Sequence, residues 1–270
     1  MRLTVVGRSP AWQDAGGACS GYLVEAEGTA LLIDCGNGVF GKLRQRIDYL
    51  DLDAVVITHI HADHVLDLAP LAYALTLSPR QDVQNGDGRP AIAAPVRPRL
   101  HLPPGGTERM RRLVGSWGRD DLIDRGFVVS GYAAGEQIEV GPLTVVPTEV
   151  PHFTETFAMT VAHGDGRFTY SADCGPNTAL VAAARGSDLL LAEATLPEGA
   201  ENTADRGHLT PAEAGRYAAE AGVARLVLTH ISDELDQEAA RAAAAAEFGG
   251  PVEIAAEGAA YDIRPISSGR

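Results

Sequence analysis

Four side chains that can bind a metal ion lie within six consecutive residues of this chain: His59, His61, Asp63 and His64. An apolar stretch, Asp53–Thr58, ends directly before them and a helical pattern begins just after them, so they occupy a turn from a strand into a helix. Alternate residues of an extended segment project to one side, which groups the first two histidines, whereas the start of the helix turns the other two side chains elsewhere. This spacing would suit two adjacent cations, one for each pair.

The residue types at this HxHxDH turn favour transition-metal ions. Imidazole suits zinc, iron and related ions, and a carboxylate widens the choice toward manganese. We expect zinc, with manganese and iron as alternatives. A polar loop that contains histidine by chance would be the simpler explanation, but three histidines and an aspartate at this spacing after an apolar strand argue against it.

Three further candidate ligands, His152, Asp173 and His230, each follow a β-rich stretch. His230 does so in a Leu-Thr-His-Ile setting that repeats the Ile-Thr-His-Ile around His59. A lone histidine at a strand end is more often structural. Because the ends of neighbouring strands converge on one edge of a sheet, three such ends together with the HxHxDH turn predict one shared site.

Other candidate residues have simpler interpretations. His101 and His163 lack a strand-end setting, and we expect both at the surface. Cys174 follows the aspartate directly and could be mistaken for a nucleophile, but no base is implied beside it, so we interpret it as a small packing residue.

The elements that must position these residues are short strands alternating with helices. β-rich runs, several of them apolar throughout as expected for strands covered on both faces, occur at residues 3–6, 21–26, 30–34, 54–58, 143–147, 157–162, 168–172, 188–194 and 225–229. Helical patterns occur at residues 65–77, 107–114, 179–186, 211–222 and 235–250. Thr210, Pro211 and Glu213 form a capping-box start, and Gly222 and Gly249 are helix stops.

This order of elements predicts an α/β protein with sheet inside and helices outside. The strand–loop–helix order around residues 54–77 recurs around residues 225–247. The stretch Pro79–Pro90 is rich in Pro, Gly, Asn and Asp and predicts an exposed loop. Because no linker or composition break is visible, we expect a single domain over residues 1–270.

The overall composition indicates which kinds of binding partner and which cell compartment to expect. The 270 residues carry a formal net charge of −14, Lys42 is the only lysine, and the nearest approach to a basic patch is Arg109, Arg111 and Arg112. A long nucleic acid is therefore an unfavourable partner, because such binders neutralise phosphates with a basic face. Three cysteines without a CxxC pair favour a reducing compartment. The first residues predict a strand rather than a signal peptide, and no apolar run approaches the ~20 residues of a membrane span, so we expect a cytoplasmic protein.

The HxHxDH turn followed by a separate histidine, aspartate and histidine resembles the metallo-β-lactamase superfamily. The resemblance covers nearly the whole chain, from the Asp34-Cys35-Gly36 turn to the last helical pattern. It implies an αββα sandwich, with mixed sheets, helices on both outer faces and the ligands along one edge. It also implies that Asp34 orients a ligand from behind.

The same resemblance implies a ligand set for two divalent metal ions. Every position of the pattern is filled in this sequence. One metal would be bound by His59, His61 and His152, a second by Asp63, His64 and His230, and Asp173 would bridge both.

Shorter motifs resemble one branch of this superfamily, the ribonuclease Z-type phosphodiesterases. The motifs are Ser171-Ala172-Asp173, Ala192-Glu193-Ala194-Thr195, Gly207-His208-Leu209-Thr210 and Leu228-Thr229-His230-Ile231-Ser232. In that branch a glutamate and an extra histidine flank the metals and assist proton transfer to the leaving group. The resemblance gives these catalytic roles to Glu193 and His208, with Asp63 adjoining. The chain has Ala192 where the family often has histidine.

One departure from that branch bears on the substrate. Ribonuclease Z enzymes that process transfer RNA insert a long basic arm between the third histidine and the bridging aspartate. In this chain His152 and Asp173 are separated by two predicted strands and the turn His163–Arg167, and no arm fits. The chain therefore resembles compact members that hydrolyse small phosphodiesters, above all cyclic nucleotides such as cyclic AMP.

Three alternatives remain at this point. The first is a ribonuclease Z-like RNA endonuclease, and the second is a carboxyl-ester, lactone or thioester hydrolase of the same fold, which would not need Glu193 and His208. The third is a non-catalytic binding protein with a relic site, which the full set of seven ligands disfavours. The resemblance also suggests a homodimer, for which the sequence offers no independent feature.

Overall fold

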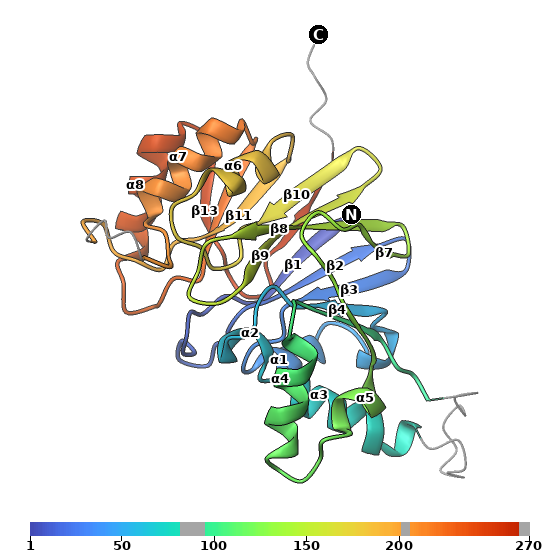
Figure 1. Cartoon of the computed structure of the whole chain (residues 1–270). Coiled ribbons are helices and arrows are strands. Elements are labelled where there is room, and N and C mark those ends of the chain that lie inside the picture. Colours follow the sequence, from blue (N-terminus) through green and yellow to red (C-terminus); the bar gives the residue numbers. More distant parts are fainter. Residues whose placement is uncertain (82–94, 201–205, 265–270) are drawn as a thin grey trace.

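The computed structural model describes residues 1–81, 95–200 and 206–264, and within these residues two seven-stranded sheets lie face to face (Figure 1). The first sheet has the spatial order β14 (Ala260–Asp262), β1 (Arg2–Gly7), β2 (Gly21–Ala26), β3 (Thr29–Ile33), β4 (Ala54–Val56), β5 (Arg99–Leu102) and β6 (Val128–Gly131). The second has the order β13 (Val252–Ile254), β12 (Arg225–Thr229), β11 (Leu189–Glu193), β10 (Gly166–Tyr170), β9 (Thr156–His163), β8 (Leu143–Val150) and β7 (Ile138–Val140).

Each sheet is antiparallel in one half and parallel in the other. Strands β14, β1, β2 and β3 pair antiparallel, and β3 to β6 pair parallel. In the second sheet β7 to β10 pair antiparallel, and β10 to β13 pair parallel. Parallel neighbours need crossover connections, and helices supply them. The prediction of mixed sheets is confirmed.

Helices cover the outer face of each sheet (Figure 1). On the first sheet these are α1 (Val39–Leu43), α2 (Ala62–Val65), α3 (Leu68–Leu77), α4 (Gly106–Gly115) and α5 (Leu122–Gly126). On the second sheet they are α6 (Thr178–Ala184), α7 (Pro211–Ala221) and α8 (Gln237–Phe248). Short 3-10 turns occur at Tyr49–Asp51 and Pro79–Gln81. The αββα sandwich that the resemblance implies is confirmed.

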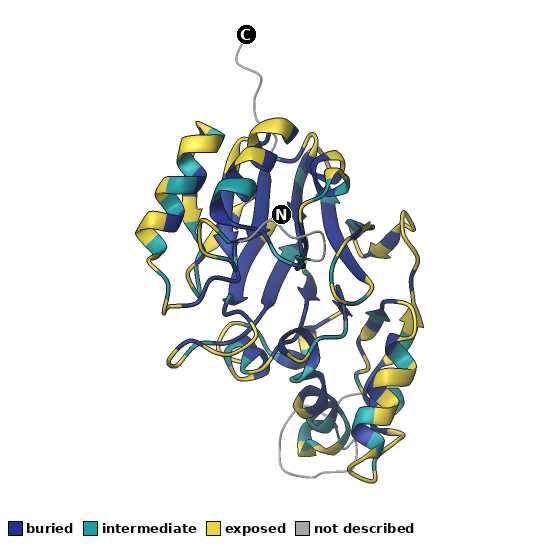
Figure 2. Cartoon of the chain, turned by 60° about the vertical axis from the view of Figure 1, so that its left-hand side comes forward, coloured by how far each residue is buried: buried dark blue, intermediate teal, exposed yellow. Residues whose placement is uncertain are grey.

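The core consists of three apolar layers, one between the sheets and one beneath each set of helices. Strand β3 shows how the sequence builds them, because Leu31 and Ile33 face the other sheet whereas Leu32 faces the helices. Strand β11 does the same with Leu191 inward and Leu190 outward. Since successive side chains point to opposite faces and both faces are covered, four consecutive residues of each strand are apolar, Ala30–Ile33 in β3 and Leu189–Ala192 in β11. Figure 2 shows the strands as the buried centre of the molecule.

Most of the predicted elements form, and the largest correction concerns residues 65–77. The single helix predicted there is two, α2 and α3, with a break before Asp67. The Asp67 carboxylate accepts from the backbone N–H of Phe40 (2.8 Å), and its own N–H donates to the carbonyl of Cys35 (3.0 Å). These bonds tie the break to the turn that follows β3. Short elements that the sequence did not predict are β5, β6, β7, β13, β14, α1 and α5.

The predicted helix ends are confirmed. Thr210 and Glu213 form the reciprocal capping box of α7, and Gly222 and Gly249 end α7 and α8 in the left-handed conformation. Of the predicted exposed loop Pro79–Pro90, residues 82–90 lie outside the described residues. Among the described residues, no helix combines the length and apolarity that crossing a membrane requires.

Candidate metal centre

The structure brings all seven predicted ligands to one edge of the sandwich. His59 lies in the turn after β4, His61 precedes the first residue of α2, and Asp63 and His64 lie in that helix. The other three follow strands of the second sheet: His152 comes after β8, Asp173 after β10 and His230 directly after β12. The first sheet therefore supplies four of these side chains and the second sheet three.

Two groups of side chains within this cluster each have four donor atoms within 4.8 Å of one another. The groups are His59, His61, His152 and Asp173, and Asp63, His64, His230 and Asp173. Asp173 belongs to both groups. Its Oδ2 lies 3.8 Å from His59 Nε2 and 3.5 Å from His230 Nε2, and its Oδ1 lies 3.4 Å from His64 Nε2. This is the position that a bridging carboxylate would need.

The donor atoms themselves indicate that the cluster fits divalent cations. The Nε2 atoms of His59 and His64 and the Oδ1 atom of Asp173 are buried and have no hydrogen-bond partner. Nδ1 of His61 and Nε2 of His152 face each other at 3.1 Å. Buried polar atoms without partners are costly, and one cation in each group would satisfy these atoms. Nitrogen and oxygen donors of this kind suit zinc, iron and manganese.

Two similar hydrogen-bond relays hold a histidine of each group from behind. His59 Nδ1 lies 3.0 Å from Thr58 Oγ1, which donates to the Asp34 carboxylate (2.9 Å). His230 Nδ1 lies 2.7 Å from Thr195 Oγ1, which donates to Glu193 (2.7 Å). In each relay the threonine hydroxyl donates its hydrogen bond to a carboxylate. The imidazole Nδ1–H therefore donates to the hydroxyl oxygen, and Nε2 keeps a free lone pair for the cation.

Direct contacts orient two more of the histidine rings. Asp34 Oδ2 lies 2.7 Å from His64 Nδ1, so this buried carboxylate serves both groups, in the role that the resemblance implies. Nδ1 of His152 lies 2.7 Å from the carbonyl oxygen of Gly207. A side chain at position 207 would crowd this ring, because a Cβ there would lie 2.9 Å from the same Nδ1.

Glu193 and His208 form a pair beside the second group. Glu193 is buried and accepts from the backbone N–H of Cys174 (2.8 Å), and its Oε1 lies 2.9 Å from His208 Nδ1. The His208 ring stacks at a centroid distance of 5.7 Å on the ring of His230. Burial alone would lower the pKa of His208, but the charge and hydrogen bond of Glu193 outweigh it and raise the pKa to about 9. His208 therefore holds a proton at neutral pH in this arrangement.

Electrostatics prepares most of the cluster to bind a cation. Burial lowers the pKa of His59, His61 and His152, which keeps these rings neutral with a lone pair available. For Asp173, burial would raise the pKa, but His230 and then His64 outweigh it and hold the pKa well below its usual range. The bridging position is therefore anionic.

Backbone strain is concentrated at this site. Among the described residues four that are not glycine have a positive φ, and three of them belong to the cluster or adjoin it: Asp34 (59°), Ala172 (52°) and His230 (57°). Each such residue costs of order 1–3 kcal/mol and persists only where its surroundings hold it in place. Such strain is typical of functional sites.

A cavity of about 350 Å³ opens onto the cluster. Its floor includes Asp63, Asp173 and His230, and His208 lies in its wall. Its rim includes the apolar residues Trp12, Pro197 and Leu235 together with the exposed carboxylate Glu234, and the buried Pro10 lies behind them in the lining. This volume lies at the lower end of the range of about 300–1,000 Å³ for small-molecule sites.

Comparison with known proteins now identifies the family. The model for the Beta-lactamase superfamily domain matches residues 29–231, which include all seven candidate ligands. The chain belongs to this superfamily. Rv1339 of Mycobacterium tuberculosis is 35% identical over 268 residues, which cover 98% of this chain and 93% of that protein. A ribonuclease Z of Myxococcus xanthus is 29% identical over 306 aligned residues, which cover 97% and 98% of the two chains.

A solved structure agrees with this assignment. The metallo-β-lactamase fold protein YhfI of Bacillus subtilis superimposes with a TM-score of 0.83 at 26% identity, over 96% of this chain and 98% of that one. These relatives agree with the ribonuclease Z-like branch that the motifs indicate. Family and His/Asp cluster together make the chain a metal-dependent hydrolase.

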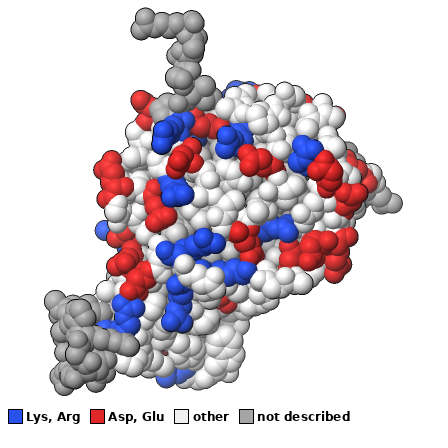
Figure 3. Space-filling view, turned by 180° about the vertical axis from the view of Figure 1, so that it is seen from behind, with Lys and Arg blue, Asp and Glu red and all other residues white. Residues whose placement is uncertain are grey.

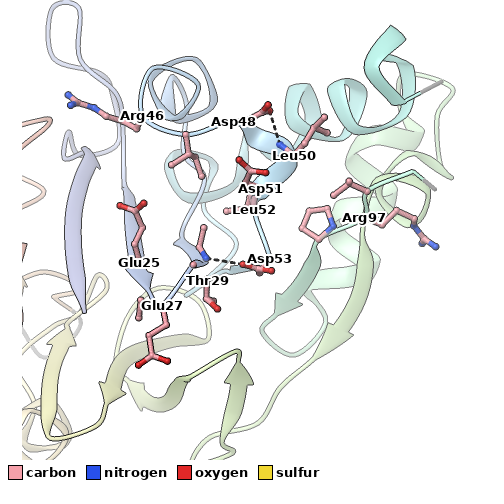
Figure 4. Close-up of a pocket in the computed structure, with 16 residues that line it drawn as sticks. Glu25, Glu27, Thr29, Arg46, Asp48, Leu50, Asp51, Leu52, Asp53 and Arg97 are labelled. Carbon is pink, nitrogen blue, oxygen red and sulfur yellow. Dashed lines mark hydrogen bonds between the residues drawn. The ribbon is translucent and has the colours of Figure 1, made fainter. Parts of the chain in front are cut away.

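The chain has a second, larger cavity of about 920 Å³. None of its lining residues belongs to the cavity at the metal centre. Figure 4 shows its carboxylates, among them Asp48 and Asp53. Asp53 accepts from the backbone N–H of Ala30 (2.9 Å) and Asp48 from that of Leu50 (3.1 Å). These carboxylates hold neighbouring loops in place, and no histidine lines this larger cavity, so the catalytic chemistry belongs to the smaller cavity.

The structure places the remaining sequence candidates outside the cluster. His163, at the end of β9, lies 3.1 Å from a carboxylate oxygen of Glu27. The prediction that His101 is a surface residue is wrong in part, because it is half-buried on β5, where its Nδ1 lies 2.9 Å from Ser130 Oγ. Cys174 is buried as predicted, and burial raises the pKa of its thiol well above the ordinary value, which makes it a poor nucleophile.

Sequence reasoning missed the roles of Thr58 and Thr195. A signal was present, because threonine precedes histidine both at His59 and at His230. The threonines that precede the two histidines, Thr58 and Thr229, have different roles. Thr58 supports His59, whereas Thr229 bonds to the hydroxyl of Tyr22 (2.7 Å) and His230 is supported by Thr195. Only the three-dimensional structure distinguishes these roles.

Proposed function

We propose that this chain is a dinuclear metal-dependent phosphodiesterase that hydrolyses small phosphodiesters, with cyclic nucleotides such as cyclic AMP as its substrates. The observation that carries the proposal is the His208–Glu193 pair, which lies at 2.9 Å beside the second ligand group and borders the cavity. Such a pair supplies a proton to an alkoxide leaving group, which a phosphodiester needs and a thioester does not.

The proposed site binds two divalent cations, with zinc expected. His59, His61 and His152 would hold one ion, Asp63, His64 and His230 the other, and Asp173 would contact both. Bound there, the cations would supply positive charge for the phosphoryl oxygens and lower the pKa of a water molecule toward neutrality.

The chain's own residues supply the remaining chemistry. Glu193 fixes the His208 ring through Nδ1, and His208 borders the cavity in which the substrate would lie. The oxygen of a water molecule bonds to phosphorus as the bond between phosphorus and the leaving oxygen breaks. His208 gives its proton to the leaving oxygen, the proton that the water releases restores His208 by way of solvent, and the product is a phosphate monoester with a free hydroxyl. Asp63 lines the same cavity and adds a carboxylate beside His230 (3.2 Å).

Three observations support a small diester over a long nucleic acid. Strands β9 and β10 pair directly as a hairpin, with His163 opposite Gly166, so nothing extends from the chain between His152 and Asp173. The cavity is small. The net charge is −14, and on the face shown in Figure 3 the arginines are interspersed with acidic side chains.

A substrate screen tests this proposal. The zinc-, manganese- and iron-loaded proteins are assayed with cyclic AMP, cyclic GMP, 2′,3′-cyclic nucleotides, a transfer-RNA precursor, a lactone and a glutathione thioester. We expect the cyclic nucleotides to be turned over fastest. Dominant cleavage of the RNA precursor would indicate a ribonuclease Z-like endonuclease, and dominant thioester turnover would contradict phosphodiester chemistry.

Replacing His208 with alanine tests the proton donor. We expect kcat on cyclic AMP to fall by about 10²- to 10⁴-fold, with a much smaller loss on bis(p-nitrophenyl) phosphate, whose leaving group needs no proton. Metal content should stay at the wild-type level. His163→Ala is the matched control, since it removes a histidine outside the site. Full activity of the His208 variant on cyclic AMP would overturn the role given to this residue.

We also propose that the enzyme is cytoplasmic and does not act at a membrane. Its support is that the three cysteines, Cys19, Cys35 and Cys174, are buried and form no disulfide with one another, as expected for a protein of a reducing compartment.

A further inference from the structure

An exposed tryptophan stands at the rim of the catalytic cavity. Trp12 lines the cavity together with Pro10 and Ala11, and 55% of its surface is exposed. Among the described residues five large hydrophobic side chains are exposed by more than half, and Trp12 is one of them. A large aromatic ring left in water beside a polar site is a marker of a binding surface.

The loop that carries Trp12 is fixed to the metal centre. Arg8 forms an ion pair with Asp14 (2.8 Å), and both side chains are largely buried. The backbone carbonyl of Arg8 accepts from the N–H of His230 (2.9 Å), and Asp14 accepts from the N–H of Asp233 (3.0 Å). The segment before and after Trp12 is therefore bonded to the loop that holds a candidate ligand.

The contacts of Arg8 and Asp14 distinguish two interpretations of the exposed Trp12 ring, an incidental surface residue and a binding residue. A tryptophan on an unsupported loop would be an incidental surface residue. Here residues on both sides of Trp12 are bonded to the His230 loop, through the carbonyl of Arg8 and the carboxylate of Asp14, so the loop keeps Trp12 beside the metal centre. A binding surface that is ordered in advance loses little entropy when a ligand arrives.

The cavity has two chemically different ends. Its floor contains the candidate ligands and would take the phosphoryl group. Its rim, with Trp12, Pro197 and Leu235, offers an apolar surface for a flat, weakly polar group attached to that phosphoryl. A nucleobase has this character, because every base presents a π-face that stacks on an aromatic ring.

We propose that Trp12 is the base-binding residue of this enzyme and stacks on the nucleobase of a cyclic nucleotide. The inference rests on the proposed function and deepens it, since it makes the base, and not only the phosphodiester, part of what is recognised. Stacking holds the substrate equally in the ground state and the transition state, so its loss raises KM and leaves kcat unchanged.

Kinetics of Trp12→Ala and Trp12→Phe test the stacking. For cyclic AMP we expect the alanine variant to raise KM by about 5- to 150-fold with kcat retained, and the phenylalanine variant to recover most of the loss. For ribose 3,5-cyclic phosphate, which lacks a base, KM should not change. Trp117→Ala is the matched control, because Trp117 is equally exposed (51%) and does not line the cavity. An unchanged KM for cyclic AMP in Trp12→Ala would overturn the inference.

Fluorescence provides a readout that does not depend on turnover. The chain has two tryptophans, so Trp117→Phe leaves Trp12 as the single indole fluorophore. We expect adenosine 5′-monophosphate to quench this variant, ribose 5-phosphate to leave it unchanged, and Trp12→Phe not to respond to either. Quenching without cyclic-nucleotide turnover would refute the proposed function and keep the base site. Turnover without quenching would refute the base site and keep the proposed function.

Discussion

Two threonine hydroxyls connect the candidate ligands to buried carboxylates. Thr58 links His59 to Asp34, and Thr195 links His230 to Glu193. Glu193 has a second task, because it also fixes the ring of His208. One carboxylate thus contacts both the relay to a candidate ligand and the proposed proton donor, so a change in the relay should affect both metal binding and turnover.

Thr195→Val tests the relay. The variant keeps the shape of the side chain but leaves His230 Nδ1 without its partner, while the Glu193 oxygen keeps only the backbone N–H of Thr195 (3.1 Å). Loss of such a supporting contact costs about 10- to 100-fold in metal affinity, which a competition titration of zinc against a chelating dye would measure. Thr144→Val is the control, since Thr144 bonds only to an exposed glutamate, Glu139. Equal zinc affinity of the two variants would show that the relay does not position His230.

The ligands and the supporting carboxylate Asp34 were predictable from sequence, and the threonines that support two of the ligands were not. The HxHxDH turn is a local pattern, and the other ligands follow strands that are themselves recognisable. The hydroxyl of Thr195 reaches His230 across 35 positions of sequence, and Trp12 meets the cavity only because its loop is bonded to the His230 loop. Contacts of this kind depend on tertiary structure that residue spacing does not contain.

At the scale of elements, the turn after β3 packs directly against α2. Gly36 lies where a Cβ would come within 1.8 Å of the backbone carbonyl oxygen of Asp63. In the same turn, the N–H of Cys35 donates to the carbonyl of His64 (2.8 Å). The close approach of these two backbones brings α2, with the candidate ligands Asp63 and His64, next to Asp34, which contacts His64 (2.7 Å).

Gly36→Ala should therefore separate the two elements. The clash is with backbone, which cannot rotate away, so we expect a loss of about 1–3 kcal/mol in the free energy of unfolding and weaker zinc binding. Gly41→Ala is the matched control, because Gly41 lies exposed in α1 with open space around its Cα. Urea unfolding of both variants measures the difference. A Gly36 variant as stable as the Gly41 variant would mean that this contact does not hold α2 in place.

The elements that the sequence predicted are those buried on both faces. Strands such as β3 and β11 are recognisable because four consecutive residues in each are apolar, and α7 because its capping box is local. Strand β6 has only exposed or half-buried residues, and β13 and β14 have three residues each, so their pairing partners define them more than their own composition does. The break between α2 and α3 depends on Asp67 and its distant partners.

At the scale of the whole molecule, the metal centre joins the two sheets. The four ligands of the HxHxDH turn follow β4 of the first sheet, and the other three follow strands of the second. Cations bound between them would link the two halves of the sandwich. The bound ions should therefore stabilise the folded chain as a whole.

Metal removal tests this coupling. At a free zinc concentration of about 100 times Kd, each bound ion adds about 2.7 kcal/mol to the free energy of unfolding, so two ions add about 5.4 kcal/mol, which for a chain of this size corresponds to a rise of about 10–20 °C in Tm. We expect a chelator to lower Tm by this amount and added zinc to restore it. Asp173→Asn, which removes the bridging charge, should abolish most of the zinc-dependent shift. A Tm that does not respond to chelation would contradict the link.

Anomalous diffraction from crystals of the zinc-loaded protein, recorded on both sides of the zinc absorption edge, tests the central claim most directly. The account predicts two peaks per chain, one surrounded by His59, His61 and His152 and the other by Asp63, His64 and His230, with Asp173 between them. A single peak, or zinc found away from these side chains, would contradict it.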